Sequence, residues 1–209
     1  MSAIVSHLMA DQIAVPQPPD THDRIIDAAL RCIARVGLSK TTLDDVAREA
    51  GCARATLYRY FPGKQPLAAA VVAREAGRLG DLLRHATEAC TTLEDAIVAA
   101  TLTAVRELSQ HDALQHVLLV EPDVLLPHLA FHHAEAFLRD ASTLVAPVFA
   151  PYLPPERAER AAEWCTRIVL SYVCSPSPDV DLFDAESVRR LVGEFIVPGF
   201  ARSSQGVTS

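Results

Sequence analysis

The sequence predicts an all-α protein, and three observations support this fold class. Apolar residues recur at steps of three and four along most of the 209 residues, which is the period of a helix that buries one face. Glycine and proline fall between these stretches, where helices begin and end. No stretch shows the alternation of apolar and polar residues that is typical of a half-buried strand. We therefore expect a small N-terminal helical unit followed by a larger helical body.

The first predicted helix follows a proline-containing arm. Residues 1–19 contain three prolines and few charges, and we expect this arm to be disordered. After it, apolar residues lie four, four and three positions apart, and Asp20 or Thr21 can act as the N-cap. Gly37 follows the last of these apolar residues and predicts the end of the helix.

Two short helices are predicted next. Thr42 can cap the first of them, and Gly51 can end it in the left-handed conformation that glycine adopts most easily. The second covers about residues 54–60, and Pro62 and Gly63 stop it. Two short helices joined by a short turn that contains glycine have the outline of a helix-turn-helix.

The rest of the chain is predicted to form the helices of the body. Thr91 and Glu94 have the spacing of a capping box, prolines 154 and 155 suit a first helical turn, and Asp184 can cap the last helix. The predicted helices cover about residues 64–85 or beyond, 91–110, 112–120, 122–126, 129–149 with an interruption near Pro147, 155–174 and 184–197.

The charge is unevenly distributed. The formal net charge is −7, yet residues 1–67 hold eight Lys or Arg and seven Asp or Glu, a net charge of +1. The remaining 142 residues hold eleven and nineteen, a net charge of −8. This asymmetry indicates an N-terminal unit that tolerates an anionic partner and an acidic body that does not approach one.

Composition also argues against several protein classes. The five cysteines are odd in number, widely spaced and without a C-x-x-C pair, which argues against a disulfide framework and a thiolate zinc site. A soluble protein of the reducing cytoplasm fits best. The N-terminus lacks the pattern of a signal peptide, and the longest uncharged run, residues 141–155, is too short to span a bilayer.

The second short helix carries a face that suits the DNA major groove. Leu57 and Phe61 are four residues apart and should pack inward. The residues on the outward face or its flanks can bond guanine, meet a thymine methyl group or bond phosphate. They are Arg54, Ala55, Thr56, Tyr58 and Arg59. Thr42 and Lys64 lie at the starts of neighbouring helices, where backbone N–H groups also favour a phosphate.

The stretch TTLDDVAREAGCARATLYRYFPGKQPL, residues 41–67, resembles the DNA-binding signature of the TetR family of transcriptional regulators. The resemblance extends over about residues 21–67. It implies a homodimer of nine- or ten-helix subunits that binds a palindromic operator in double-stranded DNA, usually as a repressor. It also implies a helix-turn-helix domain over residues 20–67 and a ligand-binding and dimerisation domain over residues 68–209.

Carried over by position, the resemblance assigns roles to single residues. Thr42 and Lys64 would contact phosphate, and Tyr58 would contact phosphate or a thymine methyl group. The base edges would face Arg54, Ala55, Thr56 and Arg59. Ala53 is a departure, because the family often has a serine that caps the helix at this position.

The body is expected to bind a small effector and to form the dimer. Its middle helices are rich in Leu, Val, Ala and Phe, which suits an apolar or amphipathic ligand such as an acyl chain, a sterol or an aromatic compound, although most of these residues can equally fill the core. The candidate ligand-binding residues are His85, His116, His132 and Trp164. The candidate dimer face lies on the last two helices and comprises Ile168, Tyr172, Val188, Leu191, Val192 and Phe195.

Two other functions remain open at this stage. The first is a constitutive DNA-binding regulator that has no small-molecule pocket. The second is a metal-dependent enzyme that uses His128 and His132, which lie one helical turn apart, together with Glu135. A metal site needs three or four converging ligands, and one helix face supplies two or three. Because the sequence has no P-loop, nucleophile elbow or zinc-protease motif, we expect no catalytic activity, no cofactor and no bound metal.

Overall fold

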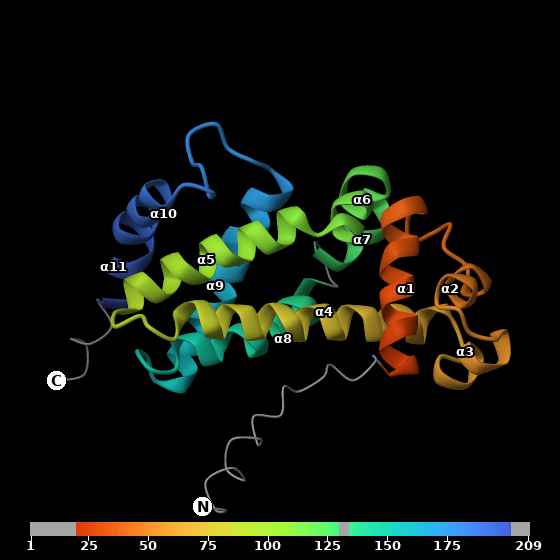
Figure 1. The fold of residues 1–209 in the computed structure, drawn as a ribbon. Helices are drawn as coiled ribbons and strands as arrows, with labels where there is room; N and C mark the ends of the chain where they lie inside the picture. The colour runs from red at the N-terminus through yellow and green to blue at the C-terminus, as the bar shows by residue number, and fades with distance from the viewer. Residues whose placement is uncertain (1–19, 130–133, 202–209) are drawn as a thin grey trace, which may run out of the picture.

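The computed structural model describes residues 20–129 and 134–201, and every regular element within these ranges is a helix. Figure 1 shows an elongated molecule in which three helices gather at one end. A long helix, α4 (Lys64–Thr87), runs from this end along the remaining helices. We call the three-helix end the head and the remainder the body. The all-α prediction is confirmed.

The head consists of α1 (Thr21–Val36), α2 (Leu43–Glu49) and α3 (Arg54–Tyr60). The predicted bounds agree with these to within one or two residues. The head has a core of its own, to which the first turns of α4 contribute. The buried residues of this core are Ile25, Ile26, Ala28, Ala29, Cys32, Val46, Ala47, Ala50, Leu57, Phe61, Leu67 and Val71.

The turn between α2 and α3 is fixed by Gly51. Its φ of +64° is in the left-handed region, as the sequence predicted. The N–H of Cys52 donates to the carbonyl of Ala47 at 3.0 Å, and the N–H of Gly51 donates to the carbonyl of Arg48 at 3.2 Å. This pair of bonds is the Schellman arrangement, which satisfies the last carbonyls of α2 and aims the chain into α3.

The body is built on α4 (Lys64–Thr87) and α5 (Leu93–Gln110), which pack against each other, and on α8 (Ala134–Phe149) and α9 (Pro155–Cys174). Between α5 and α8 lie α6 (Asp112–Val120) and α7 (Pro122–Leu129). The chain then continues through α10 (Ala185–Leu191), one π-helical turn (Val192–Ile196) and α11 (Val197–Ala201). The largest side chain that is fully buried in the body is Phe149.

Three predicted details of the body were wrong. Thr92, not Thr91, caps α5, since its hydroxyl accepts the N–H of Asp95 at 3.1 Å. The helix that contains Pro147 is not interrupted there, because Pro147 lies in the last turn and is itself exposed, as is Thr143, whose carbonyl it leaves unpaired and which can meet water. The last helix does not stop near Val197, because one wide turn lets it continue.

The head meets the body where α1 packs on α6. Ile33 of α1 is buried together with Ala113 and Val117 of α6. At the end of α6, the buried side chain of Glu121 reaches into the loop between α1 and α2, where both carboxylate oxygens accept the N–H of Ser39, at 3.2 and 3.3 Å. We call this contact between Glu121 and the α1–α2 loop the joint.

Gly37 leaves room for the joint. Its φ of 88° and ψ of 165° lie in a region that is almost exclusive to glycine. A Cβ at this position would lie 2.7 Å from the carboxyl carbon of Glu121. Burial alone would raise the pKa of Glu121, but the N–H donors of Ser39 and Leu38 and the nearby His116 outweigh it and hold the pKa below its usual value. The carboxylate therefore stays ionised, bonded to the loop that leads into α2.

Ion pairs also connect the head to the body. Arg74 of α4 pairs with Asp27 of α1 at 2.7 Å and with Glu75 at 3.2 Å. Arg78 of α4 pairs with Glu75 at 3.4 Å and with Glu107 of α5 at 3.0 Å. This charged network links α1, α4 and α5.

Candidate nucleic-acid interface

The short helix α3 is held by two apolar side chains and exposes the opposite face. Leu57 is fully buried and Phe61 nearly so, as the spacing predicted. Thr56 is half-buried at the edge of this face. The exposed residues of α3 are Arg54, Ala55, Tyr58, Arg59 and Tyr60. Apart from the half-buried Thr56, the predicted base-reading residues are therefore exposed on α3.

Arg54, the first residue of α3, is held by two helices. Its Nη1 lies 3.0 Å from a carboxylate oxygen of Asp44 on α2, and its Nη2 donates to the hydroxyl of Tyr58 at 3.3 Å. Its guanidinium carbon lies 5.3 Å from the centroid of the Tyr58 ring. The Tyr58 hydroxyl and the Asp44 carboxylate together raise the pKa of Arg54. The side chain is nevertheless 66% exposed, so it is fixed in direction and still open to a ligand.

Thr42 caps α2, as predicted. Its hydroxyl accepts the N–H of Asp45 at 3.1 Å and donates to the Asp45 carboxylate at 2.5 Å. Asp45 also pairs with Arg48 at 2.9 Å, and the bonds from Thr42 and Arg48 lower its pKa. The exposed Thr42 hydroxyl is thus already used within the head, and a phosphate would have to share or replace one of these bonds.

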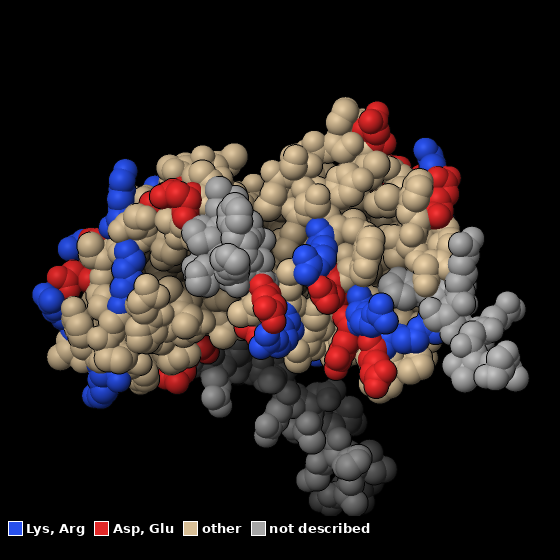
Figure 2. Space-filling model, turned by 180° about the vertical axis from the view of Figure 1, so that it is seen from behind, with Lys and Arg blue, Asp and Glu red and all other residues tan. Residues whose placement is uncertain are grey.

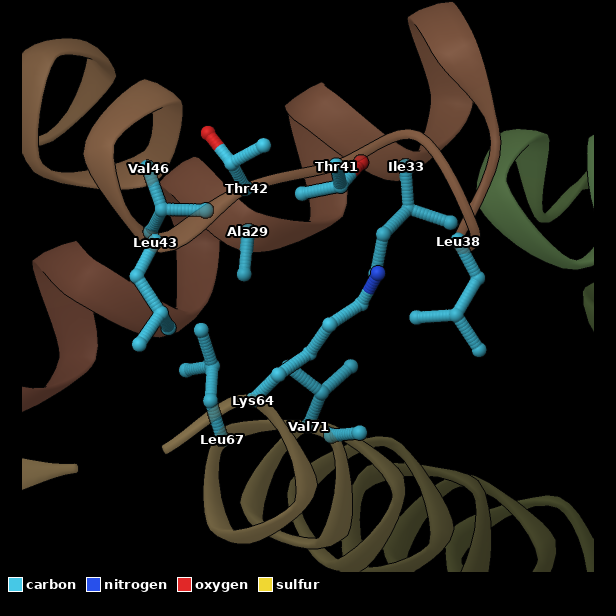
Figure 3. A pocket seen from close by; sticks show the side chains of 11 residues that line it. Ala29, Ile33, Leu38, Thr41, Thr42, Leu43, Val46, Lys64, Leu67 and Val71 are labelled. Carbon is cyan, nitrogen blue, oxygen red and sulfur yellow. The ribbon is translucent and has the colours of Figure 1, made fainter. Parts of the chain in front are cut away.

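Lys64 lies at the start of α4, but its ammonium group bonds the head itself. It donates to the carbonyl of Ser39 at 2.9 Å. Figure 3 shows the side chain extending from α4 towards Thr41 and Ile33, alongside a small cavity. That cavity holds only about 10 Å³, which is room for about one water molecule and too little for an effector. A phosphate contact by Lys64 remains a proposal, and it requires the side chain to leave Ser39.

Most of the other arginines of the head bond carboxylate or carbonyl groups of the head on other surfaces. Arg31 and Arg35 of α1 both pair with Glu49, at 2.8 and 3.3 Å. Arg24 donates to the carbonyl of Ala50 at 2.7 Å. Figure 2 shows basic side chains along the outer edge of the head, at the left, and acidic and basic side chains next to each other along the lower edge of the body. The difference in charge between the two parts agrees with the sequence.

One stability prediction concerns the N-terminus of α3. Ala53 has the extended backbone of a capping residue, with φ of −66° and ψ of 145°, but makes no side-chain cap bond. We expect Ala53→Ser to raise the free energy of unfolding by about 1 kcal/mol, because its hydroxyl would accept an N–H of the first turn. Denaturant unfolding measures this change. Ala55→Ser, inside the same helix, is the control, and equal effects of the two substitutions would contradict the prediction.

The structure does not bring the candidate ligand-binding residues together. His85 lies near the end of α4 and Trp164 is on α9, whereas the half-buried His116 is on α6, next to the head at the other end of the body from His85 (Figure 1). Trp164 is 60% exposed, and His132 lies outside the described residues. The three candidates that are described therefore lie apart from one another, and their roles in binding an effector stay predictions.

His85 does line a hollow of about 510 Å³ on the body. Its wall comes from the ends of α4 and α8 and the turns that follow them. The other lining residues are Arg84, Thr87, Glu88, Cys90, Pro147, Val148, Pro151 and Tyr152. Two of these lining residues bond each other, because the Tyr152 hydroxyl donates to the carbonyl of Cys90 at 2.7 Å.

The candidate dimer face needs a correction. Val188 and Val192 are 0% and 1% exposed and belong to the core of their own subunit, because α10 packs on α5. Ile168, Tyr172 and Leu191 are half-buried against the same core. Of the six predicted residues, Phe195 is largely exposed, at 72%. Helical spacing identified the apolar residues but could not tell the inner face from the outer one.

The other expectations concern metals and membranes. His132 lies outside the described residues, and Glu135 is exposed and pairs with Arg139 at 3.0 Å. Among the side chains that are described, no three His, Cys, Asp or Glu residues form a group that could hold a metal ion. No helix in the described ranges is long and apolar enough to cross a membrane.

Two residues of this region were missed at the level of sequence. The sequence patterns singled out neither Asp44 nor Glu121 as a functional residue. Their partners, Arg54 and Ser39, lie 10 and 82 positions away in the sequence. A local pattern contains no signal for either contact.

Family models of known proteins match both the head and the body of the chain. The family model described as "Bacterial regulatory proteins, tetR family" matches residues 25–71. A second, described as "Bacterial Tetracyclin repressor, C-terminal domain", matches residues 92–193. The helix-turn-helix-type transcriptional regulator Rv1255c of Mycobacterium tuberculosis is 30% identical over 183 residues, which cover 84% of this chain and 83% of that protein. SrpR of Pseudomonas putida, a regulator of the same type, is 46% identical over 54 residues, or 26% of this chain and 25% of SrpR.

Solved structures share the fold. The TetR family repressor AlkX from a Dietzia species, implicated in biodegradation of n-alkanes, has a TM-score of 0.64 at 22% identity and covers 85% of this chain and 95% of its own. FadR from Bacillus subtilis, solved with stearoyl-CoA, has a TM-score of 0.53 at 19% identity and covers 82% and 97%. At these identities the likeness concerns the fold alone.

Proposed function

This chain belongs to the TetR family of transcriptional regulators, and on that premise we propose that it is a repressor that binds a palindromic operator as a homodimer. It would act in the cytoplasm, where the operator DNA lies. A small effector that binds the body better in the arrangement unable to reach the operator would release it. The division into a head over residues 20–67 and a body over residues 68–209 is part of this proposal.

The exposed face of α3 is the observation that supports specific DNA binding. Arg54 presents a guanidinium that can bond guanine with two parallel bonds, and the methyl group of Ala55 can meet a thymine methyl. Tyr58 and Arg59 lie beside them on the exposed face. Thr42 and the first N–H groups of α2 and α4 suit phosphate groups on either side. A second head, related by twofold symmetry, would read the other half of the palindrome.

The dimer would form through the last helices of the body. Trp164 of α9 and Phe195 of the π-helical turn are the large apolar side chains exposed there. Burying such side chains between two subunits is a strong driving force for association. We expect Phe195→Ala to shift the protein from dimer to monomer in analytical ultracentrifugation.

The effector is proposed to be apolar or amphipathic. The body helices are rich in aliphatic residues, and the structural relatives include one solved with stearoyl-CoA. A medium-chain fatty acid, a sterol and an aromatic acid are suitable first probes. An effector has to weaken operator binding, so a compound that only raises the melting temperature does not qualify. If no probe of any chemical class releases the operator, the chain is a constitutive regulator.

Selection of bound sequences from a random duplex pool, at near-physiological salt, tests the operator proposal. The expected result is one enriched palindrome with half-sites about one helical turn, or a multiple of it, apart. Weak, strongly salt-dependent binding without enrichment would contradict it. Genomic matches to the palindrome would then identify the regulated genes.

Substitution of Arg54 gives a sharper prediction. We expect Arg54→Ala to remove about 1–3 kcal/mol of discrimination at one base pair of each half-site, because the direct contact to that base is lost. Competition binding with operators changed at single positions measures it. Arg139→Ala removes the same charge from the exposed surface of α8 and is the control. An equal loss of affinity for all sequences, in place of a local one, would exclude base reading by Arg54.

A further inference from the structure

We propose that Asp44 is a positioning residue that holds the Arg54 guanidinium in the orientation that reads its base pair. This inference rests on the proposed specific binding of DNA by α3. Asp44 places a carboxylate on the face that would meet the DNA, although a negative charge at this position by itself opposes the binding of a polyanion.

The two acidic residues at the start of α2 have different contacts. The Asp45 carboxylate accepts bonds from the Thr42 hydroxyl and from Arg48, and the Asp45 N–H donates to the Thr42 hydroxyl, so Asp45 belongs to the cap of its own helix. Asp44 reaches across to α3, where one of its oxygens lies 3.0 Å from Nη1 of Arg54. Half of the Asp44 side chain remains exposed. Its carboxylate therefore faces the same surface as the base-reading helix and would repel a nearby phosphate.

The contacts of Arg54 restrict its orientation without covering it. Asp44 holds Nη1, the Tyr58 hydroxyl holds Nη2, and the Tyr58 ring lies beside the guanidinium. A guanidinium has five N–H donors in one plane, so three remain for DNA. The two contacts come from α2 and α3, and together they fix the plane of the Arg54 guanidinium relative to the whole helix-turn-helix.

A guanidinium that is held in one orientation favours discrimination between bases. Arginine has many rotamers, and ordering such a side chain opposes binding. A free arginine can also turn to a phosphate, which carries no sequence information. A guanidinium held by Asp44 loses less freedom when it meets guanine, and it is kept from neighbouring phosphates. Asp44 would thus weaken general attraction to DNA and sharpen the choice of one base pair.

The two effects of Asp44 have opposite signs and can be separated. In Asp44→Asn, we expect affinity for random-sequence DNA to rise, because one negative charge is removed from the DNA-facing surface. We expect discrimination at the Arg54 base pair to fall by about twofold to fivefold, the range typical of an exposed charge pair. Asp44→Glu keeps the carboxylate and should restore part of the discrimination.

The experiment is a double-mutant cycle between Asp44→Asn and Arg54→Ala in the full-length protein. Affinity is measured for the selected operator, for the operator changed at the Arg54 base pair, and for random-sequence DNA. With Arg54 present, Asp44→Asn should lower discrimination. In the Arg54→Ala background it should leave discrimination unchanged, while affinity for random-sequence DNA still rises. A role of Asp44 only in the stability of α2 would lower all affinities alike and overturn the inference.

Failure of this inference can be distinguished from failure of the proposed function. If the wild-type protein selects no sequence, specific binding is wrong and the inference falls with it. If Arg54→Ala relaxes one base pair and Asp44→Asn leaves that discrimination intact, the operator function stands and the role of Asp44 is overturned. If Asp44→Asn only raises affinity for every sequence, the pair weakens DNA binding and does not orient Arg54, and the inference is again overturned.

Discussion

In the Gly37→Ala variant, the free energy of unfolding is expected to fall by about 2–5 kcal/mol, because two unfavourable effects act at one position. An alanine would have to adopt the φ of 88° and ψ of 165° of Gly37, a conformation that is close to exclusive to glycine. Its Cβ would also lie 2.7 Å from the Glu121 carboxyl carbon. The carboxylate would have to leave the N–H of Ser39, and the joint between head and body would open.

Denaturant unfolding of Gly37→Ala, compared with Gly77→Ala, measures this effect. Gly77 lies inside α4, and a Cβ there meets nothing within 4 Å, so this control should gain about 0.5–1 kcal/mol. Opposite signs for the two substitutions are the expected result. Equal effects would mean that the α1–α2 loop can rearrange freely and that the joint contributes nothing to stability.

Acidification should gradually lower the contribution of the joint to stability, because Glu121 becomes protonated. The pKa of Glu121 is lower in the folded protein than its usual value, so the unfolded chain binds a proton more readily at this residue. The stabilisation by Glu121 is therefore present above its ordinary pKa of about 4.3 and is lost as the pH falls through the lower folded value. Glu121→Gln should remove this contribution to the pH dependence, in unfolding measured between neutral and acidic pH.

The Leu57→Ala variant is expected to lose operator binding at moderate temperature and about 2–5 kcal/mol of stability. Leu57 is fully buried in the head core, and a helix of seven residues is not stable without tertiary packing. Removing the side chain leaves a cavity under the helix that carries the base readers. The orientation of Arg54, Tyr58 and Arg59 towards DNA would be lost together.

Leu119→Ala is the matched control for this variant, since Leu119 is 79% exposed at the end of α6. The same chemical change should alter stability there by less than about 0.5 kcal/mol. Thermal unfolding and operator affinity across temperature measure both variants. Normal operator affinity of Leu57→Ala near its melting temperature would show that α3 does not depend on this anchor.

The head could be predicted closely from sequence, because its determinants are local. The bounds of α3, the cap at Thr42, the left-handed Gly51 and the inward positions of Leu57 and Phe61 all follow from spacing within one or two turns. The absence of a capping side chain at Ala53 could be predicted from the sequence in the same way. The exposed residues of α3 are then those that the apolar spacing does not place in the core.

The contacts that organise the site over longer distances could not be predicted. Asp44 with Arg54, and Lys64 and Glu121 with Ser39, depend on where α2, α4 and α6 are placed in three dimensions. For a similar reason, the sequence could not tell which candidate residues of the dimer face are covered within their own subunit, because Val188 and Phe195 have equally apolar side chains and only packing on α5 decides which is covered. His85 and His116 were grouped by residue type, whereas His85 lies at the far end of α4 and His116 lies on α6, next to the head.

The charged network that connects the head to the body bears on how a salt titration of this protein should be interpreted. Arg74, Arg78, Asp27, Glu75 and Glu107 link three helices. Added salt screens exposed pairs such as Arg78 with Glu107 as well as contacts to phosphate. A pair that is the same in the free and the DNA-bound protein cancels from the slope of log affinity against log salt, so the network adds a term only where one of its pairs breaks or forms when the head binds DNA. In that case, dividing the slope by the value for one phosphate would count contacts that are not at the DNA. A titration of Arg78→Gln beside the wild type separates the two terms, so that the number of phosphates neutralised by each head is obtained from the corrected slope.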